Sequence, residues 1–556
     1  MATVAVAVAG SAEGKAKSSK PSAIPPAVRR AMDRAEPNEI KAHTRFLSDD
    51  ALEGRGPGTR GDDLAVSYIA SRLEAAGLEP AGENGTWYQP VPLIGILTDP
   101  QKTSLSLTPL AGGNAMPLRY LEDYTATDQT QSASNTLDSE LIFVGHGVVA
   151  PEYNWDDYKG VDVRGKTIVM LVDDPPASAT EPELFKGKAR TYYGRWTYKY
   201  EIAAQKGATG AILVHTKDAA GYVWDVVRNS WGRERSYLKV KQGEPALRIA
   251  SWLTEPAAQS LMKAGGHDLA ALTSKAHTRE FRPVPLNYKI TGSIASTVRP
   301  FNTRNVLGRI RGSDRALGEE AVLYTAHHDH LGIGKAVNGD AIYNGAVDNA
   351  TGVAVVLEMA RMWKLASPAP KRTLIFNFVA AEEQGLLGSA WYGQNPTIPA
   401  GRIALNLNFD SVGQLGRVRN ATMNGVERTT FHPTALRVTK ALGMRIDPDE
   451  HPEQGYYYRS DHFSLGKVGV PAFSVDAGSE VIGQTKEWAD AQEVDYRDNR
   501  YHAPGDEFDE KWDFTSGVQV AQLGFWLGWE AANALEMPTW KAGDEFMAAR
   551  QRSLGK

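Results

Sequence analysis

The sequence predicts an α/β fold: a three-layer α/β/α sandwich with a mostly parallel central sheet. From residue 301 onward, short apolar runs of strand length alternate with longer segments of helical spacing. Strands that alternate with helices form parallel sheets with helices on both faces. The run at 373–379 is apolar throughout, which is typical of a strand buried on both sides. No internal repeat offers a competing architecture.

The predicted elements follow in chain order. Residues 31–76 form two helical pieces, separated by a Gly/Pro-rich loop at 53–59, and Gly77 ends the second piece. From about residue 139 the strands are shorter and the connections longer. There we expect strands at 141–144, 166–172 and 210–214 and a helix at 198–206. Farther on we expect strands at 321–326, 373–379, 403–409 and 470–475 and helices at 352–365 and 517–535.

These differences in strand length and connection length divide the chain into predicted segments. They are a leader at 1–38, the first part of the main domain at 39–135, an inserted β-rich domain at 136–297, the larger part of the main domain at 298–535, and a C-terminal tail at 536–556. The chain of 556 residues is too long for one core, which agrees with more than one domain.

Composition excludes several classes of function. The net charge is −5 and no basic stripe stands out, so nucleic acid is not an expected partner. No apolar run is long enough to span a membrane. The absence of cysteine removes disulfides, thiolate metal sites and cysteine nucleophiles. Any zinc must therefore be bound by histidines and carboxylates, the ligands of catalytic sites.

The first twelve residues have two interpretations. Their Ala/Val run ends in small residues, as in a signal peptide, but the basic leader segment is missing. A truncated export signal would place the protein in the periplasm or outside the cell. A disordered tail is the alternative, with a cytoplasmic location, and the Lys/Ser/Pro-rich stretch at 13–26 favours disorder in either case.

Metal-type ligands follow three separate predicted strands. His327 ends the strand at 321–326, Glu382 and Glu383 follow the strand at 373–379, and Asp410 follows the strand at 403–409. Ligands of open α/β sheets collect at the carboxyl ends of strands. We therefore expect these side chains to meet at one edge of the sheet.

The His327-His328-Asp329-His330 run can be sorted by alternation along an extended segment. His327 and Asp329 then share one face, and Asp329 can accept the second ring N–H of His327. His328 and His330 become packing or surface residues. Asp348 has two interpretations: it caps the N-terminus of the following helix, or its carboxylate bridges two ions.

The Glu382-Glu383 pair suits a division of labour in hydrolysis. One glutamate can bind metal while the other faces the water whose pKa the metal lowers toward about 7, and accepts its proton. An acidic helix start is the ordinary alternative. His502 lies in a loop ended by Pro504 and Gly505, and Tyr501 beside it can donate a hydrogen bond to a developing oxyanion.

Together these residues resemble the di-zinc aminopeptidases of peptidase family M28, over roughly 300–535. The matching elements, in family order, are His-x-Asp (His327, Asp329), Asp-Asn-Ala-x-Gly (348–352), the Glu-Glu pair, Asn-x-Asp-x-x-Gly (Asn408, Asp410, Gly413) and Tyr-His-x-x-x-Asp (Tyr501, His502, Asp506).

The resemblance implies two Zn²⁺ per chain, with each site residue in a set role. His327 and Asp410 would bind one ion, Glu383 and His502 the other, and Asp348 both. Glu382 would be the general base and Tyr501 would support the tetrahedral intermediate. It also implies a cis peptide bond between Asp348 and Asn349. Three carboxylates and two neutral imidazoles leave two Zn²⁺ a formal charge of +1, which one hydroxide balances.

The inserted segment resembles a protease-associated (PA) domain, through residues 161–169 and 199–214. Such a domain would either limit substrate size as a lid or serve only stability. Nearby, Ser460-Asp461-His462 cannot form a Ser-His-Asp triad because adjacent residues do not present that geometry, so we expect Ser460 to cap a helix. Arg459 before it is a candidate for binding a substrate carboxylate.

The resemblance implies an exopeptidase whose partners are peptides with a free N-terminus; the oligomeric state stays open. A carboxypeptidase or a glutaminyl cyclase-like enzyme on the same scaffold are the alternatives, with Arg459 the one candidate for a terminal carboxylate. A receptor-like protein with a degenerate site is a fourth reading, and the complete ligand set and Glu382 argue against it.

Overall fold

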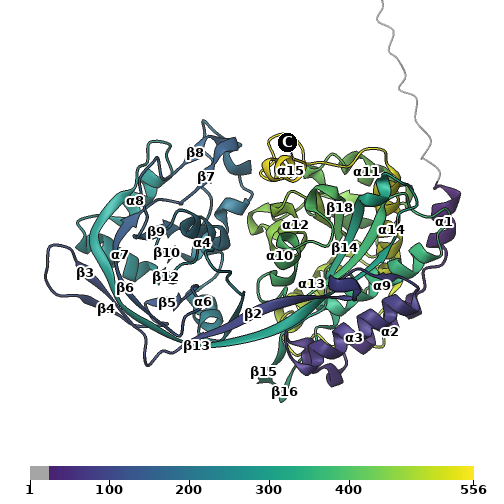
Figure 1. The fold of residues 1–556 in the computed structure, drawn as a ribbon, viewed down its shortest axis with the longest axis horizontal. Coiled ribbons are helices and arrows are strands. Elements are labelled where there is room, and N and C mark those ends of the chain that lie inside the picture. The colour runs from purple at the N-terminus through teal and green to yellow at the C-terminus, as the bar shows by residue number, and fades with distance from the viewer. Residues whose placement is uncertain (1–23, 556) are drawn as a thin grey trace, which may run out of the picture.

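A computed structural model describes residues 24–555, which fold into two lobes joined by two long strands (Figure 1). The first twelve residues, with the predicted export signal, lie outside the described part of the chain. Within residues 24–555, no helix combines the length and hydropathy needed to cross a membrane.

The larger lobe is built on a mixed sheet with a parallel centre. Its order is β21 (Ala472–Ser474), β18 (Ile403–Asn408), β14 (Ala321–His327), β17 (Thr373–Val379), β13 (Val284–Ile310), β2 (Tyr88–Thr98) and β11 (Arg235–Leu238). The first four strands pair in parallel, and β13, β2 and β11 continue the sheet antiparallel. The short β1 (Glu79–Pro80) also pairs with β13.

Helices cover both faces of this sheet, because alternate side chains of each strand point to opposite faces. On β14, Val322 and Tyr324 belong to one apolar core and Ala321 and Leu323 to another. The helices of the first core are α1 (Pro26–Met32), α2 (Pro37–Leu47), α3 (Arg60–Ala75), α9 (Gly352–Lys364), α11 (His432–Ala441) and α14 (Thr515–Asn533). Those of the second are α10 (Leu387–Gln394) and α12 (His462–Lys467). The predicted three-layer α/β/α sandwich is confirmed.

The smaller lobe also has helices on both faces of its sheet. The sheet order is β13, β6 (Ser134–Phe143), β9 (Thr167–Leu171), β10 (Gly210–His215), β12 (Ile249–Thr254) and β5 (Tyr124–Thr127), and β3 (Ser104–Pro109) and β4 (Met116–Leu118) extend it. One core contains α4 (Trp196–Gln205) and α6 (Trp224–Trp231), and the other α7 (Glu255–Ala264) and α8 (Leu269–Ala276).

The remaining elements are short and lie at the edges of the lobes. They are α5 (Lys217–Ala220), α13 (Lys486–Asp495), α15 (Met547–Ser553), the hairpin β15 (Gly332–Val337) and β16 (Asp340–Tyr343), the small sheet of β19 (Asn420–Thr422), β20 (Arg445–Asp447) and β22 (Asp476–Ala477), and the pair β7 (Val149–Ala150) and β8 (Trp155–Asp156).

Four predicted boundaries need correction. The smaller lobe begins before residue 136, because β3 and β5 already pair with its strands β13 and β12. It has no sharp end at 297, because β13 runs unbroken through both lobes. The segment after 535 is not a free tail: Trp540 is buried, and Arg550 donates to the carbonyl of Ile403. In the predicted leader, residues 26–32 form α1, with Val28 buried.

Candidate metal centre

The carboxyl ends of the parallel strands bring the predicted residues together. His327 is the last residue of β14 and pairs with Val379, the last residue of β17. Glu382 and Glu383 follow β17 by a few residues, and Asp410 follows β18. Asp348 enters from the turn before α9, and His502 from the loop that follows α13. The strand register therefore explains why residues far apart in sequence share one site.

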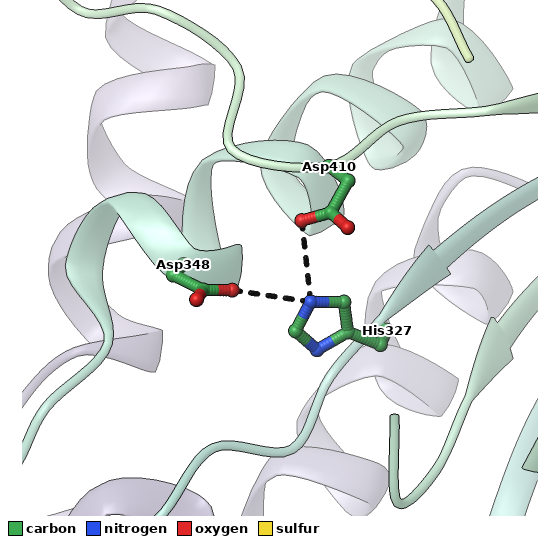
Figure 2. Close-up of side chains that lie close together, drawn as sticks. All are labelled: His327, Asp348 and Asp410. Carbon is green, nitrogen blue, oxygen red and sulfur yellow. Dashed lines mark hydrogen bonds and ion pairs between the residues drawn. The ribbon is translucent and has the colours of Figure 1, made fainter. Parts of the chain in front are cut away.

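One imidazole nitrogen lies between two carboxylates (Figure 2). Nε2 of His327 is 3.2 Å from Oδ1 of Asp348 and 3.3 Å from Oδ1 of Asp410. The other ring nitrogen, Nδ1, is 3.2 Å from the carbonyl oxygen of Asp329. If Nδ1–H donates to that carbonyl, Nε2 carries no hydrogen. Its lone pair then faces two carboxylate oxygens that also carry lone pairs. A shared cation is what makes this arrangement favourable.

The second half of the cluster repeats this pattern. Nε2 of His502 is 3.3 Å from Oδ2 of Asp348 and 3.0 Å from Oε2 of Glu383. The two carboxylate oxygens of Asp348 therefore face two different imidazoles. The donor set fits a pair of zinc ions: three carboxylates and two imidazoles, with Asp348 placed to bridge.

The electrostatics of the cluster also favour bound positive charge. Burial opposes charging of His327, but the Asp410 and Glu382 carboxylates raise its pKa well above the ordinary value. Burial likewise opposes charging of His502, and the Glu383 and Asp348 carboxylates raise its pKa to about 10. Each imidazole thus occupies a point where the surrounding carboxylates stabilise a cation.

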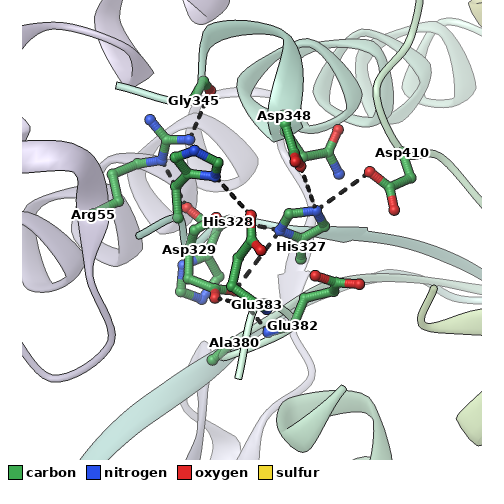
Figure 3. Close-up of polar contacts among 12 residues, drawn as sticks. Arg55, His327, His328, Asp329, Gly345, Asp348, Ala380, Glu382, Glu383 and Asp410 are labelled. Carbon is green, nitrogen blue, oxygen red and sulfur yellow. Dashed lines mark hydrogen bonds and ion pairs between the residues drawn. The ribbon is translucent and has the colours of Figure 1, made fainter. Parts of the chain in front are cut away.

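The two adjacent glutamates diverge from the strand end (Figure 3). Glu383 points into the cluster toward His502 and His330, while the Glu382 carboxylate lies on another side of His327. Burial raises the pKa of Glu382 well above its ordinary value, against the effect of His327, and the charges of Glu383 and Asp410 add to the rise. Their backbone N–H groups both donate to Asp329, at 3.0 and 3.4 Å.

That contact corrects the expected role of Asp329. Its carboxylate lies 3.8 Å from Nδ1 of His327, and the ring faces its main-chain carbonyl instead. The carboxylate fixes the backbone of the two glutamates. The physical reason is that β14 ends at His327, so face alternation does not continue through Asp329.

For the same reason, His330 is not a surface residue. It is fully buried, and Nδ1 lies 2.7 Å from Oε1 of Glu383. His330, Asp348 and Glu383 form a second group able to hold a cation, so His330 competes with His502 for this role. His328 is a packing residue, as predicted: it is buried, with Nε2 3.0 Å from the carbonyl of Arg304.

Three supporting residues were not predicted in these roles. Asp506 accepts the backbone N–H groups of Val347 and Asp348, both at 3.0 Å, and so holds the bridging turn. Ser460 does not cap the helix that follows; its hydroxyl donates to Oδ2 of Asp410 at 2.6 Å. A polar residue just before a helix gives no sequence signal for this contact, because Asp410 is 50 residues away in the chain.

Arg55 is the third unpredicted residue and reaches the site from the Gly/Pro loop before α3 (Figure 3). It is 1% exposed, and its guanidinium donates to the carbonyls of His328 (2.8 Å), Asn344 (2.6 Å), Gly345 (2.9 Å) and Leu47. Burial lowers its pKa to about 10, so it stays charged at neutral pH. One side chain therefore ties the histidine segment to the turn that presents Asp348.

Tyr501 and its neighbour Tyr496 both lie near the carboxylates. The ring of Tyr501 stacks on His502, with centroids 3.9 Å apart, and is 48% exposed. Burial and then the Asp348 charge raise its pKa. The buried hydroxyl of Tyr496 has no hydrogen-bond partner within the described chain, and Asp506 and Asp348 raise its pKa after burial does. Arg459 is exposed and directly precedes Ser460 in the chain.

The fold and the donor set together define a candidate metal centre at the carboxyl edge of an α/β sheet. The peptide bond between Asp348 and Asn349 is cis, as the resemblance implies. Residues 305–523 match the model of peptidase family M28.

Curated relatives match over a short stretch. A "Probable zinc metalloprotease" of Pyrenophora teres f. teres is 35% identical over 122 residues, covering 22% of this chain and 24% of the relative. A "Vacuolar membrane protease" of Schizosaccharomyces japonicus is 31% identical over 144 residues, covering 26% and 16%. The match thus spans about a quarter or less of each of these two relatives.

Solved structures align over most of the chain at low identity. An aminopeptidase from Aneurinibacillus sp. strain AM-1 has a TM-score of 0.48 and 19% identity, covering 92% of this chain and 97% of that one. A zinc aminopeptidase from Bacillus subtilis has a TM-score of 0.41 and 17% identity, covering 90% and 97%.

Proposed function

We propose that this protein is a zinc-dependent exopeptidase that removes N-terminal residues from peptides. One observation supports it above the others: Asp348 presents its two oxygens to His327 and His502, flanked by Asp410 and Glu383. Two zinc ions bound there would supply Lewis acidity and lower the pKa of water toward about 7. The match of residues 305–523 to a peptidase family agrees with this chemistry.

In this proposal the residues of the chain divide the work. Glu382 accepts the proton of the attacking water and returns it to the leaving amine. Its raised pKa suits a group that must hold a proton between the two steps. Tyr501, stacked on His502, donates a hydrogen bond to the oxygen of the scissile carbonyl as negative charge develops there.

Recognition of a free N-terminus follows from charge. The cluster holds buried carboxylates on several sides, and Glu382 and Asp410 are the two that face away from the His502 half. A substrate ammonium group beside them gains an ion pair that an acylated terminus cannot make. We propose that the smaller lobe is a PA-type domain that restricts the length of peptide that reaches the site.

The test combines metal content with substrate blocking. Zinc per chain is measured by elemental analysis, and cleavage of aminoacyl anilides with free and acetylated N-termini is compared with and without chelator. We expect about two zinc ions, cleavage of the free substrate alone, and loss of activity after chelation. Equal rates on free and acetylated substrates would refute the aminopeptidase assignment.

A further inference from the structure

A cavity of about 240 Å³ lies between the two lobes and is lined by three arginines. Arg190 and Arg195 come from the smaller lobe and Arg459 from the larger. Trp196 and Tyr222 complete its wall. The cavity is below the roughly 300–1,000 Å³ of pockets that enclose a whole small-molecule ligand, so it suits one end of a ligand.

The positive charge of this cavity is largely unbalanced. Nε of Arg190 is 3.3 Å from Oδ1 of Asp173, the one ion pair that the three guanidinium groups make among residues 24–555. Arg459 reaches the amide oxygen of Gln454 at 3.5 Å and lies over the ring of Tyr456. Two full positive charges therefore remain without a carboxylate.

The surroundings of Arg195 favour a bound anion in this cavity. Its Nε is buried and has no hydrogen-bond partner in the described structure. Burial, followed by the charges of Arg459 and Arg190, lowers its pKa to about 10. Holding three like charges together is unfavourable unless an anion joins them, since a carboxylate can accept paired N–H bonds from a guanidinium group.

One lining residue of the cavity, Arg459, directly precedes a residue that contacts the metal centre. Arg459 is followed by Ser460, whose hydroxyl donates to Oδ2 of Asp410 at 2.6 Å. Consecutive Cα atoms are about 3.8 Å apart and an extended residue spans about 3.3–3.6 Å, so a peptide of two or three residues covers the distance from Asp410 to a guanidinium on Arg459.

On this basis we propose that the arginine cavity binds the carboxylate of a short peptide substrate, at its C-terminus or on an acidic side chain, while the amino end lies at the metal centre. The proposal rests on the proposed exopeptidase function and narrows its substrates to short peptides with a remote negative charge. The two lobes then each contribute to one binding site, which explains why cationic side chains of both lobes face the same cavity.

The test compares three substrates that differ in charge: leucyl-alanine, leucyl-alanine amide and leucyl-glutamate amide. With the zinc-loaded full chain, we expect kcat/KM for leucyl-alanine to exceed that for its amide about 10–100-fold, the size of a charge-assisted contact. Arg195→Gln and Arg459→Gln should each lower this acid-to-amide ratio about tenfold, through KM. Leucyl-glutamate amide distinguishes a side-chain carboxylate from a terminal one.

Two controls keep the result interpretable. Arg164→Gln removes an exposed arginine of the smaller lobe that pairs with Asp162 and should leave the ratio unchanged. Arg459 is exposed, so Arg459→Gln remains informative even if Arg195→Gln does not fold. Equal kcat/KM for all three substrates, or a ratio unaffected by both variants, would overturn the proposal.

A binding measurement separates this proposal from the proposed function. The chelator-treated full chain is titrated calorimetrically with leucyl-alanine and with its amide. Tighter binding of the acid, lost in Arg459→Gln, supports the arginine site even if no peptide is cleaved. Cleavage of amide and acid at equal rates, with equal binding, leaves the exopeptidase standing and removes the arginine site.

Discussion

At the scale of single residues, the site depends on which oxygen faces which ring. Asp348 could have been a helix N-cap, but its oxygens face His327 and His502, and Asn349 instead accepts the backbone N–H of Gly352 at the start of α9. Glu382 and Glu383 are chemically identical neighbours whose side chains point in different directions, which agrees with the proposed roles of base and ligand.

Glu382→Gln tests this separation. The substitution removes the proton acceptor but keeps the shape of the side chain, so we expect normal zinc content and a loss of kcat of about 10²–10⁴-fold. Elemental analysis and steady-state kinetics on the same preparation provide the measurement. The matched control is Glu383→Gln, which should lose zinc. A Glu382→Gln enzyme with near-normal turnover would contradict the assignment.

Arg55→Lys tests the link between the two ligand segments. A lysine cannot present the planar fork that reaches the carbonyls of His328, Asn344 and Gly345. Each buried carbonyl left unpaired costs about 1–3 kcal/mol, so we expect a loss of about 2–4 kcal/mol in the free energy of unfolding. Denaturant unfolding of the metal-free protein measures it. Arg60→Lys, at an exposed position, should change stability little, and equal effects would argue against this role.

The site residues that could be predicted from the sequence are those that follow the ends of predicted strands. His327, Glu382, Glu383 and Asp410 follow buried apolar runs, and such runs fix where a strand stops and which edge it faces. His330 was misjudged because the backbone leaves the sheet after His327. Contacts such as Ser460 to Asp410 depend on tertiary packing, and no local pattern encodes them.

At the scale of elements, helix α14 approaches the sheet through glycines. A Cβ at Gly528 would lie 1.7 Å from the hydroxyl of Tyr324, and one at Gly524 would lie 2.7 Å from the ring of Phe409. Glycine lowers helix stability by about 1 kcal/mol relative to alanine, so its presence here serves close packing.

We therefore expect Gly528→Ala to destabilise the protein by about 1–3 kcal/mol, because overpacking outweighs the gain in helix propensity. Thermal unfolding measures the change. In a Tyr324→Phe background the nearest clashing atom is gone, so the same substitution should cost less. An equal cost in both backgrounds would show that the hydroxyl is not the obstacle.

Most helices and strands were predictable, because the spacing of apolar residues and the positions of Gly and Pro are local features of the sequence. The strand at 373–379 and the helix at 352–365 were located to within a residue. The strands at 104–109 and 124–127 were missed, and with them the start of the smaller lobe. Their partners lie more than 100 residues later in the chain, so pairing rather than local sequence defines them.

At the scale of the whole molecule, metal removal should lower stability. Five candidate ligand side chains converge in the larger lobe, and a cation that binds only the folded state stabilises it by about 2.7 kcal/mol at a free concentration 100 times its Kd. We expect chelation to lower Tm and added zinc to restore it. Asp348→Asn should show a much smaller response; a shift as large as in the wild type would place the metal elsewhere.

The pairing of strand β13 with β2 affects how the chain folds during translation. It joins residues about 200 positions apart, such as Thr98 and Ser296. At synthesis rates of about 5–20 residues per second, the ribosome needs about 10–40 s to deliver that partner. During this interval β2 exposes an edge rich in Val, Leu and Ile that the finished sheet covers. We therefore expect the nascent chain to need protection from aggregation during this interval, and translation products that end before residue 296 to aggregate more readily than the full chain.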